Sequence, residues 1–259
     1  MFGEGKVAIV TGIGPGMGAS IAIGFAKLGV DVAIAARRKE RLDAVADEIR
    51  KLGREPLVFP LDITDFEGCR ELVRQTAERF GGVDFLVQNG HDEGDWSPAV
   101  DADLERWRRV FDVNFFGTLA LAQASAYEMR KRGGGSMVFV SSGAGIQAPP
   151  GMGAYAASKA ALHSLTRSLA QELGPWNIRC NDVVLGATAG ETLNEAAKQV
   201  SKQQGITPEE WLANKHKSFP LGSVPEPKDI AGTVFYLCSD LAKPVTGTHI
   251  PVNNGQWIL

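Results

Sequence analysis

Short apolar segments alternate with longer amphipathic segments along most of the chain. The first apolar run, residues 6–10, is followed by glycines and then by apolar residues at helical spacing in 19–28. Similar apolar runs predict strands at residues 31–35, 56–60, 84–87, 136–140, 178–184 and 248–252. The amphipathic segments predict helices at about 38–52, 66–80, 103–131, 153–174 and 227–239. Because parallel strands need crossover helices, this alternation predicts a doubly wound parallel β-sheet in a three-layer α/β/α arrangement.

The alternation shows no domain boundary, which predicts one domain spanning residues 1–259. Its one interruption is the polar, helix-like segment at about 186–222, between the sixth and seventh predicted strands. Long connections in compact domains are usually lids or binding loops. We therefore expect a substrate lid here, with a purely structural excursion as the alternative.

Composition narrows the class of protein. The 259 residues carry 27 basic and 30 acidic side chains, and this net charge of −3 argues against a nucleic-acid binder. No segment approaches the ~18 apolar residues of a membrane span, and the first residues lack the apolar core of a signal peptide. We expect a cytoplasmic protein that binds neither membrane nor nucleic acid.

The cysteines are few and far apart. Cys69, Cys180 and Cys238 form neither a metal-binding pair nor an even disulfide set. Buried free thiols are the expected state, and a catalytic thiol is the less favoured alternative. No metal site is predicted.

A glycine-rich turn separates the first predicted strand from the first predicted helix. It reads Thr11-Gly12-Ile13-Gly14-Pro15-Gly16-Met17-Gly18. Glycines let the backbone approach a pyrophosphate, and the following helix directs its N-terminus at the anion. The strand and helix on either side favour a Rossmann-type dinucleotide site over an ordinary turn. The residues expected to contact the cofactor are Gly12, Gly14, Gly16, Met17 and Gly18.

Two arginines follow the second predicted strand. An NAD site would place a carboxylate there, about twenty residues beyond the glycines, to bind the ribose hydroxyls. This chain has Ala36 at that point, followed by Arg37 and Arg38. Because a guanidinium can grip a 2′-phosphate, the sequence predicts NADP(H) as cofactor. The alternative is that Arg37 contacts only solvent.

Asp62 and Ile63 follow the third predicted strand, where they would lie beside the adenine. An aspartate at this point could instead cap the helix that begins near Phe66. The sequence does not separate these two interpretations.

A tyrosine and a lysine lie four residues apart at the start of a predicted helix. This spacing puts Tyr155 and Lys159 on one helical face. A tyrosine of pKa ~10 is a poor base at neutral pH, and a nearby ammonium is expected to lower that pKa. Ser142 ends the preceding predicted strand, at the sheet edge where ligands of such folds bind.

These motifs make the sequence resemble the short-chain dehydrogenase/reductase family across nearly the whole chain. The resemblance rests on Thr11-Gly12-x-x-x-Gly16-x-Gly18, on Asn114 in Val113-Asn114-Phe115-Phe116-Gly117, on Ser142 and on Tyr155-x-x-x-Lys159. It implies that Tyr155 is the general acid/base and that Ser142 hydrogen-bonds the substrate oxygen. Lys159 would lower the pKa of Tyr155 and bind the nicotinamide ribose. Asn114 would maintain a helix irregularity that anchors a water leading from Lys159 to solvent.

Three segments depart from the family pattern. Gln88-Asn89-Gly90-His91 stands where Asn-Asn-Ala-Gly is usual, with Asn89 and Gly90 still expected to contact cofactor. His91 adds a titratable ring, for which a structural role is favoured over a chemical one. Leu185-Gly186-Ala187-Thr188-Ala189-Gly190 replaces the usual Pro-Gly-x-Val-x-Thr, and Gly186 and the Thr188 backbone are still expected to reach the cofactor. Val252-Asn253-Asn254-Gly255 replaces the common Val-Asp-Gly-Gly and is expected to affect packing.

Together these features predict an NADP(H)-dependent oxidoreductase that interconverts a ketone and a secondary alcohol. The alternatives are a non-catalytic NADP-binding sensor or scaffold, and a lyase or epimerase that uses the same tyrosine. Residues 143–153 and 90–98 contain no lysine or arginine, and Glu191 and Glu195 in the lid would repel anions, so we expect an uncharged, largely apolar carbonyl or alcohol substrate. Apolar positions on the long helices, together with the family resemblance, predict a homotetramer.

Overall fold

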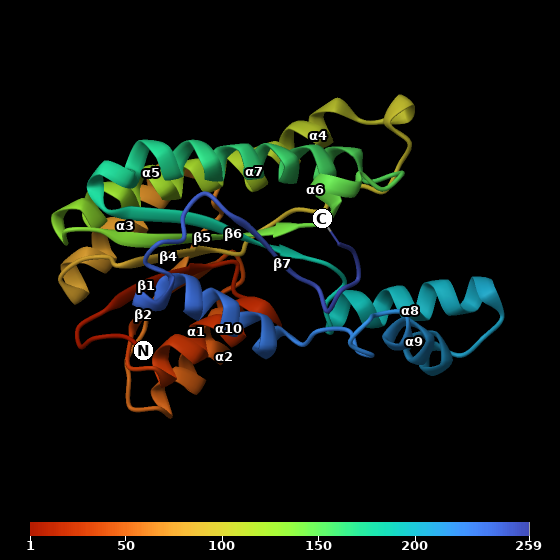
Figure 1. Ribbon diagram of the computed structural model, residues 1–259, viewed down its shortest axis with the longest axis horizontal. Coiled ribbons are helices and arrows are strands. Elements are labelled where there is room, and N and C mark those ends of the chain that lie inside the picture. Colours follow the sequence, from red (N-terminus) through yellow and green to blue (C-terminus); the bar gives the residue numbers. More distant parts are fainter. Residues whose placement is uncertain (259) are drawn as a thin grey trace.

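The predicted strands form a single parallel sheet. Within residues 1–258, the part of the chain that the computed structural model describes, seven strands lie in the order β3-β2-β1-β4-β5-β6-β7 (Figure 1). The strands are β1 (Val7–Thr11), β2 (Asp31–Ala36), β3 (Leu57–Pro60), β4 (Phe85–Gln88), β5 (Gly135–Ser142), β6 (Ile178–Leu185) and β7 (His249–Val252). The strand order reverses between β1 and β4, and such a switch point opens a crevice at the carboxyl ends of the strands.

Helices cover both faces of the sheet, which confirms the predicted three-layer α/β/α fold. Figure 1 shows α1, α2 and α10 on one face and α3, α5 and α7 on the other. The helices are α1 (Met17–Lys27), α2 (Lys39–Arg50), α3 (Phe66–Phe80), α4 (Leu104–Phe111), α5 (Thr118–Lys131), α6 (Ala144–Gln147), α7 (Gly153–Leu173), α8 (Glu191–Gln204), α9 (Pro208–Lys217) and α10 (Pro227–Cys238). Each face of the sheet packs a separate apolar cluster, with Val138 and Phe25 in one and Phe139 and Leu162 in the other.

The prediction of one continuous helix at 103–131 is wrong. The helix is interrupted by a π-helical segment, η2 (Asp112–Gly117), between α4 and α5. The buried Asn114 side chain bonds to residues outside this helix, and Gly117 lies so close to Ile63 that a Cβ would be 2.7 Å from its carbonyl oxygen. These contacts favour the wider turn, and such turns are frequent at functional sites.

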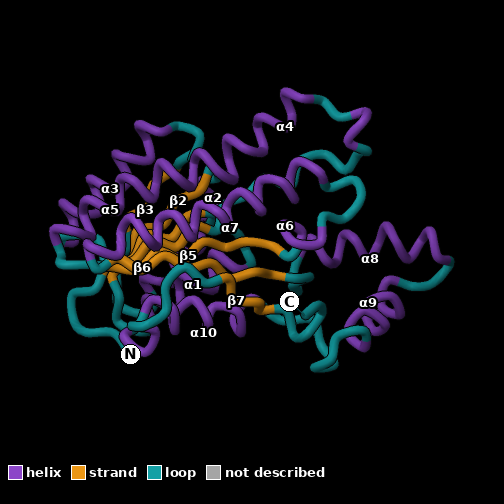
Figure 2. The backbone as a smooth tube through the Cα atoms, turned by 45° about the horizontal axis from the view of Figure 1, so that its top comes forward, coloured by secondary structure: helices purple, strands orange, loops and turns teal. Residues whose placement is uncertain are grey.

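The interruption predicted at 186–222 contains two helices. α8 and α9 lie beyond the carboxyl end of the sheet, where Figure 2 shows them projecting from the main body. Thr207 and Glu210 form a capping box at the start of α9, and Gly205 ends α8 with a φ of 70°. A small apolar cluster around Leu193, Phe219 and Val224 holds the segment together. The helix-like character is therefore confirmed, and the lid role stays a prediction.

The two edge strands are short, and each contains a proline. β3 ends at Pro60, and β7 carries Pro251, which stands opposite Val184 of β6. Within residues 1–258, no helix is long and apolar enough to cross a membrane.

The three cysteines are buried, as predicted, and unbonded. Burial raises the pKa of Cys69, Cys180 and Cys238 each to about 12. A thiol with this pKa carries almost no thiolate at neutral pH, which excludes these cysteines as nucleophiles.

Candidate active site and cofactor cleft

A cleft of about 790 Å³ opens at the carboxyl ends of the central strands, on the switch point. Sixteen of the seventeen predicted site residues line it. These are Gly12, Gly14, Gly16, Met17, Gly18, Arg37, Arg38, Asp62, Ile63, Asn89, Gly90, Ser142, Tyr155, Lys159, Gly186 and Thr188. The seventeenth, Asn114, is buried and is not part of the lining.

The glycine turn between β1 and α1 is built by close backbone contacts. Gly12 has a φ of 71°, and a Cβ there would lie 2.2 Å from the Gly90 nitrogen. A Cβ on Gly18 would lie 2.4 Å from the Gly12 oxygen. The Asn89 amide donates to that same oxygen at 2.8 Å and ties the end of β4 to the turn. The N-terminus of α1 thus borders an open backbone cradle, which fits the pyrophosphate of a dinucleotide.

Three arginines line this cleft near the end of β2 and the start of α2. Arg37 and Arg38 precede α2 and are exposed at its N-terminus, as the sequence indicates. Arg41 also lines the cleft, and its guanidinium lies 3.3 Å from the position of a Cβ on Gly14. An ion pair of 3.5 Å joins Arg41 to Glu191 at the start of α8. The sequence analysis missed Arg41, which lies in the first turn of α2.

Asp62 lies in the cleft and does not cap a helix. The helix-cap interpretation is wrong, because Asp65 caps α3 by accepting from the Gly68 nitrogen at 3.0 Å. Asp62 instead accepts from the Thr64 nitrogen at 3.1 Å and pairs with Arg109 at 2.6 Å. Burial raises the pKa of Asp62, but the hydrogen bonds from Thr64 and Arg109 outweigh it and leave the pKa below its ordinary value.

Tyr155 and Lys159 lie on the first turns of α7 and face Ser142 at the end of β5. The two α7 side chains are almost fully buried, with exposed fractions of 9% and 2%. The Lys159 ammonium donates to the Val140 oxygen at 2.9 Å and lies 5.6 Å from the centre of the Tyr155 ring. The predicted shared helical face is therefore present, and the strand end supplies the hydroxyl beside it.

The pKa values of this pair move in directions set by burial. Burial raises the pKa of Tyr155 to about 12, against the lowering effect of a hydrogen bond with Ser142. The expectation of a lowered phenol pKa is thus wrong for this structure. Burial likewise lowers the pKa of Lys159 to about 8, partly opposed by the carboxylates of Asp182 and Glu93. Lysine is accordingly the group of the pair that gives up its proton first.

The loop after β4 brings two further titratable groups into the cleft. The His91 ring centre lies 6.2 Å from that of Tyr155, and its Nε2 lies 3.6 Å from Glu93. The neighbouring His91 ring holds the pKa of Glu93 below its ordinary value, so this half-buried carboxylate is ionised close to Tyr155 and Lys159. The sequence analysis missed Glu93, because no motif marks its position.

Asn114 holds the loop after β4 in place through hydrogen bonds to Asp92. Its side chain accepts from the Asp92 nitrogen at 2.8 Å and donates to the Asp92 oxygen and the Ser158 hydroxyl, each at 2.9 Å. Asp92 is held further by an ion pair with Arg106. The helix irregularity implied by the resemblance is therefore present, and the water-anchoring role stays an expectation.

The substrate end of the cleft is mainly apolar and aromatic. The apolar side chains lining it are Trp96, Ala144, Pro149, Met152, Leu193, Trp211 and Trp257. Glu195, which was expected to repel anions from the lid, lies outside the lining, so this part of the substrate argument is wrong. Glu191 does line the cleft but pairs with Arg41. Lys215 of α9 adds a cation that the two loops lack.

The C-terminal segment also reaches the cleft, which the sequence analysis missed. The Gln256 side chain accepts from the Ala187 nitrogen at 2.7 Å. Trp257 packs against Gly143, where a Cβ would lie 2.6 Å from the indole. Gln256 thus holds the strand-end loop that contains Gly186 and Thr188 in place.

Comparisons with known proteins agree with this architecture. A family model described as short chain dehydrogenase matches residues 6–201. The 7alpha-hydroxysteroid dehydrogenase of Escherichia coli (strain K12) is 36% identical over 253 residues, covering 97% of this chain and 94% of that protein.

Solved structures show the same fold with either nicotinamide cofactor. The L-sorbose reductase of Gluconobacter frateurii, complexed with NADPH and L-sorbose, is 30% identical with a TM-score of 0.91, over 99% of this chain and 98% of that one. Carveol dehydrogenase from Mycobacterium avium, in complex with NAD, is 27% identical with a TM-score of 0.91, over 98% of each chain. The chain therefore belongs to the short-chain dehydrogenase family of oxidoreductases.

Proposed function

We propose that the protein is an NADP(H)-dependent oxidoreductase that interconverts a ketone and a secondary alcohol. One observation carries the proposal: the buried Tyr155 and Lys159 pair and the Ser142 hydroxyl face the same cleft as the glycine turn. This places an acid, a hydroxyl donor and a cation within one cleft that also fits a dinucleotide.

Each of the three side chains has a separate task. The Tyr155 phenol, which stays protonated at neutral pH, donates its proton to the carbonyl oxygen in the reduction direction. In the alcohol direction the phenol proton first leaves towards the Lys159 amine, and the resulting phenolate accepts the proton of the alcohol hydroxyl. The Ser142 hydroxyl donates a hydrogen bond to the same oxygen and stabilises the negative charge that develops there. Lys159 places a positive charge beneath the phenol ring and binds the nicotinamide ribose. The nicotinamide of NADP(H), when bound, supplies or accepts the hydride.

Preference for NADP(H) rests on this chain's own cations, since related structures hold NAD or NADPH. Ala36 leaves no carboxylate to bind the ribose hydroxyls, and Arg37 and Arg38 stand exposed at the cleft rim. Arg41 supplies a third guanidinium over the glycine turn. Guanidinium groups fit phosphate oxygens with two parallel hydrogen bonds, so this cluster favours a 2′-phosphate.

The substrate is proposed to be uncharged and largely apolar. Aromatic and aliphatic side chains dominate the lining near Ser142 and Tyr155, and pockets of this kind bury apolar ligands. Residues 186–222 are proposed as the lid, since Leu193, Trp211 and Lys215 border the cleft from α8 and α9. Lys215 is a cation of this lining that would favour anionic substrates, and its contribution is directly measurable.

A carbonyl and alcohol panel tests the proposal. We expect a net fall in NADPH absorbance with uncharged ketones and a net rise from NADP with secondary alcohols. The Lys215→Ala variant should leave turnover of uncharged ketones unchanged. Tight NADPH binding, seen as quenched tryptophan fluorescence, with no net absorbance change across the panel would overturn it. That outcome would favour a sensor, a lyase or an epimerase.

A further inference from the structure

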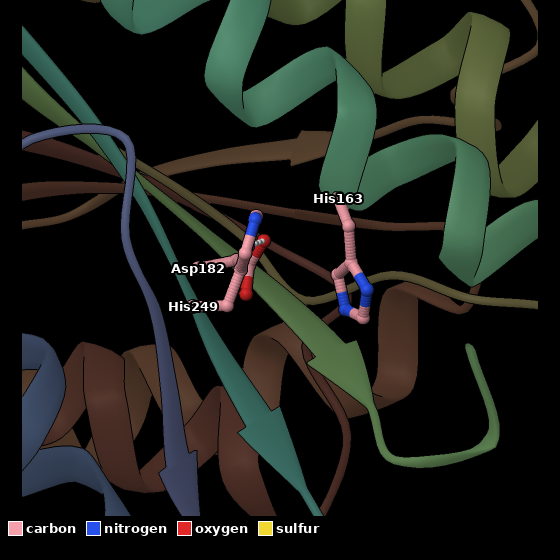
Figure 3. Close-up of side chains that lie close together, drawn as sticks. All are labelled: His163, Asp182 and His249. Atoms are coloured by element: carbon pink, nitrogen blue, oxygen red, sulfur yellow. Dashed lines mark hydrogen bonds and ion pairs between the residues drawn. The ribbon is translucent and has the colours of Figure 1, made fainter. Parts of the chain in front are cut away.

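Two histidines and an aspartate form a buried cluster on the α7 face of the sheet. His163 comes from α7, Asp182 from β6 and His249 from β7, and Figure 3 shows their side chains converging between these elements. Each offers one ligand atom, and these atoms all lie within 4.8 Å of one another. Asp182 is fully buried, His163 nearly so, and the His249 side chain is 18% exposed. None of the three lines the cofactor cleft.

The hydrogen bonds of the cluster leave one polar atom unpaired. His249 Nδ1 lies 2.6 Å from Asp182 Oδ2, and His163 Nε2 lies 2.7 Å from the Ser141 hydroxyl. Within residues 1–258, Asp182 Oδ1 is buried and has no hydrogen-bond partner. An unpaired carboxylate oxygen in the interior is costly, and such an atom in a native structure indicates a missing water or ion.

The charge of the cluster favours a cation over further hydrogen bonds. The Asp182 carboxylate is fully buried and its Oδ1 has no partner among the described residues, while His163 and His249 each offer a ring nitrogen beside it. Neutral imidazole and ionised carboxylate are the forms that bind metal ions. His249 at the partly exposed edge provides the route by which an ion enters.

We propose that His163, Asp182 and His249 bind a divalent transition-metal ion, with Zn²⁺ as the best match. Two imidazoles and one carboxylate suit Zn²⁺, whereas Ca²⁺ and Mg²⁺ prefer oxygen ligands throughout. At Zn–ligand distances of ~2.0–2.2 Å, ligand atoms on a tetrahedral ion lie ~3.5 Å apart. The longest distances between the ligand atoms of the cluster therefore have to shorten by roughly 1 Å when the ion binds.

Arg167 allows a test in which the direction of the change in metal affinity is predicted. Its guanidinium donates to His249 Nε2 at 3.0 Å and places a positive charge beside the cluster. This contact opposes a bound cation by charge, and it stabilises the tautomer in which His249 Nδ1 keeps its proton for Asp182. Removing the guanidinium should therefore strengthen metal binding, whereas loss of a merely structural contact would weaken the cluster.

The experiment uses the full chain after treatment with a chelator and gel filtration. Calorimetric titration with ZnCl₂ should give one strong site per chain, and metal analysis of the dialysed protein should agree. His249→Ala and His163→Gln should each abolish that site, while His216→Ala, which removes a histidine of α9, should leave it intact. Arg167→Ala should tighten binding, by about tenfold on the scale of outer-shell effects. Co²⁺ should give the visible absorption of a tetrahedral site.

Three outcomes would overturn the proposal. These are the absence of stoichiometric binding, binding that survives both His249→Ala and His163→Gln, and weaker binding in Arg167→Ala. Because His249 lies at the sheet edge and is partly exposed, its variant is expected to fold, which circular dichroism checks. Asp182→Asn tests the buried ligand separately and should also remove the site.

Discussion

Replacing Arg37 with alanine should remove most of the proposed preference for NADP over NAD. Within residues 1–258, Arg37 makes no hydrogen bond or ion pair, and its side chain is exposed at the cleft rim. The substitution therefore costs the fold almost nothing. Its effect should appear in the binding of the 2′-phosphate, and wild-type protein should prefer NADP by at least ~10-fold.

The magnitude follows from the kind of contact. A hydrogen bond between a guanidinium and a phosphate contributes about 1.5–3 kcal/mol, and each 1.4 kcal/mol is a factor of ten in affinity. Because Arg37 is exposed, solvent and salt screen its charge, so the lower end of that range applies. Arg37→Ala should raise the Michaelis constant for NADP about tenfold, with little change for NAD. The loss should shrink further as ionic strength increases.

Lys39→Ala is the matched control. Lys39 is a cation two residues further on, but it pairs with Asp43 and lies outside the cleft lining. Its removal should leave both Michaelis constants unchanged. An Arg37→Ala enzyme with the wild-type ratio of NADP to NAD constants would refute the assignment, and a comparable loss in Lys39→Ala would show a general charge effect.

Three further predictions concern the catalytic pair and the assembly. Tyr155→Phe should lower turnover by ~100-fold or more while NADPH still binds, and near-full activity with an unchanged pH profile would contradict the mechanism. Oxidation should accelerate and reduction should slow as pH rises through about 8, because Lys159 loses its proton first and the neutral amine can then accept the phenol proton that oxidation has to remove. Initial rates in both directions across pH check this, and profiles flat through this range would contradict it. Sedimentation should give a homotetramer of the 27.7 kDa chain, and a 27.7 kDa particle at micromolar concentration would refute that.

Elements were predictable from the sequence where burial is continuous. The strand at 178–184 and the helix at 153–174 read clearly, because each buries a full face against the sheet. The break in the helix predicted at 103–131 was implied by the family resemblance through Asn114, but it was not readable from the apolar periodicity. A single π-helical turn shifts the apolar periodicity by only one residue, and its cause lies in contacts to Asp92 and Ile63.

The site was predictable where its residues share a motif. Tyr155 and Lys159 lie one helical turn apart, so their shared face follows from spacing alone. Glu93 and Trp257 reach the cleft through loops, and no spacing rule links them to the motif. The raised pKa of Tyr155 could not be predicted either, because burial of the phenol is a property of the folded chain.

The prolines at both margins of the sheet restrict how copies of this chain can meet. A free edge strand offers a row of unpaired amides that another chain can extend into a continuous, aggregating sheet. Pro60 and Pro251 each remove one of those donors, on strands of only four residues. Growth by strand addition is thereby disfavoured at both ends. The surfaces left for any self-association are then the helical ones.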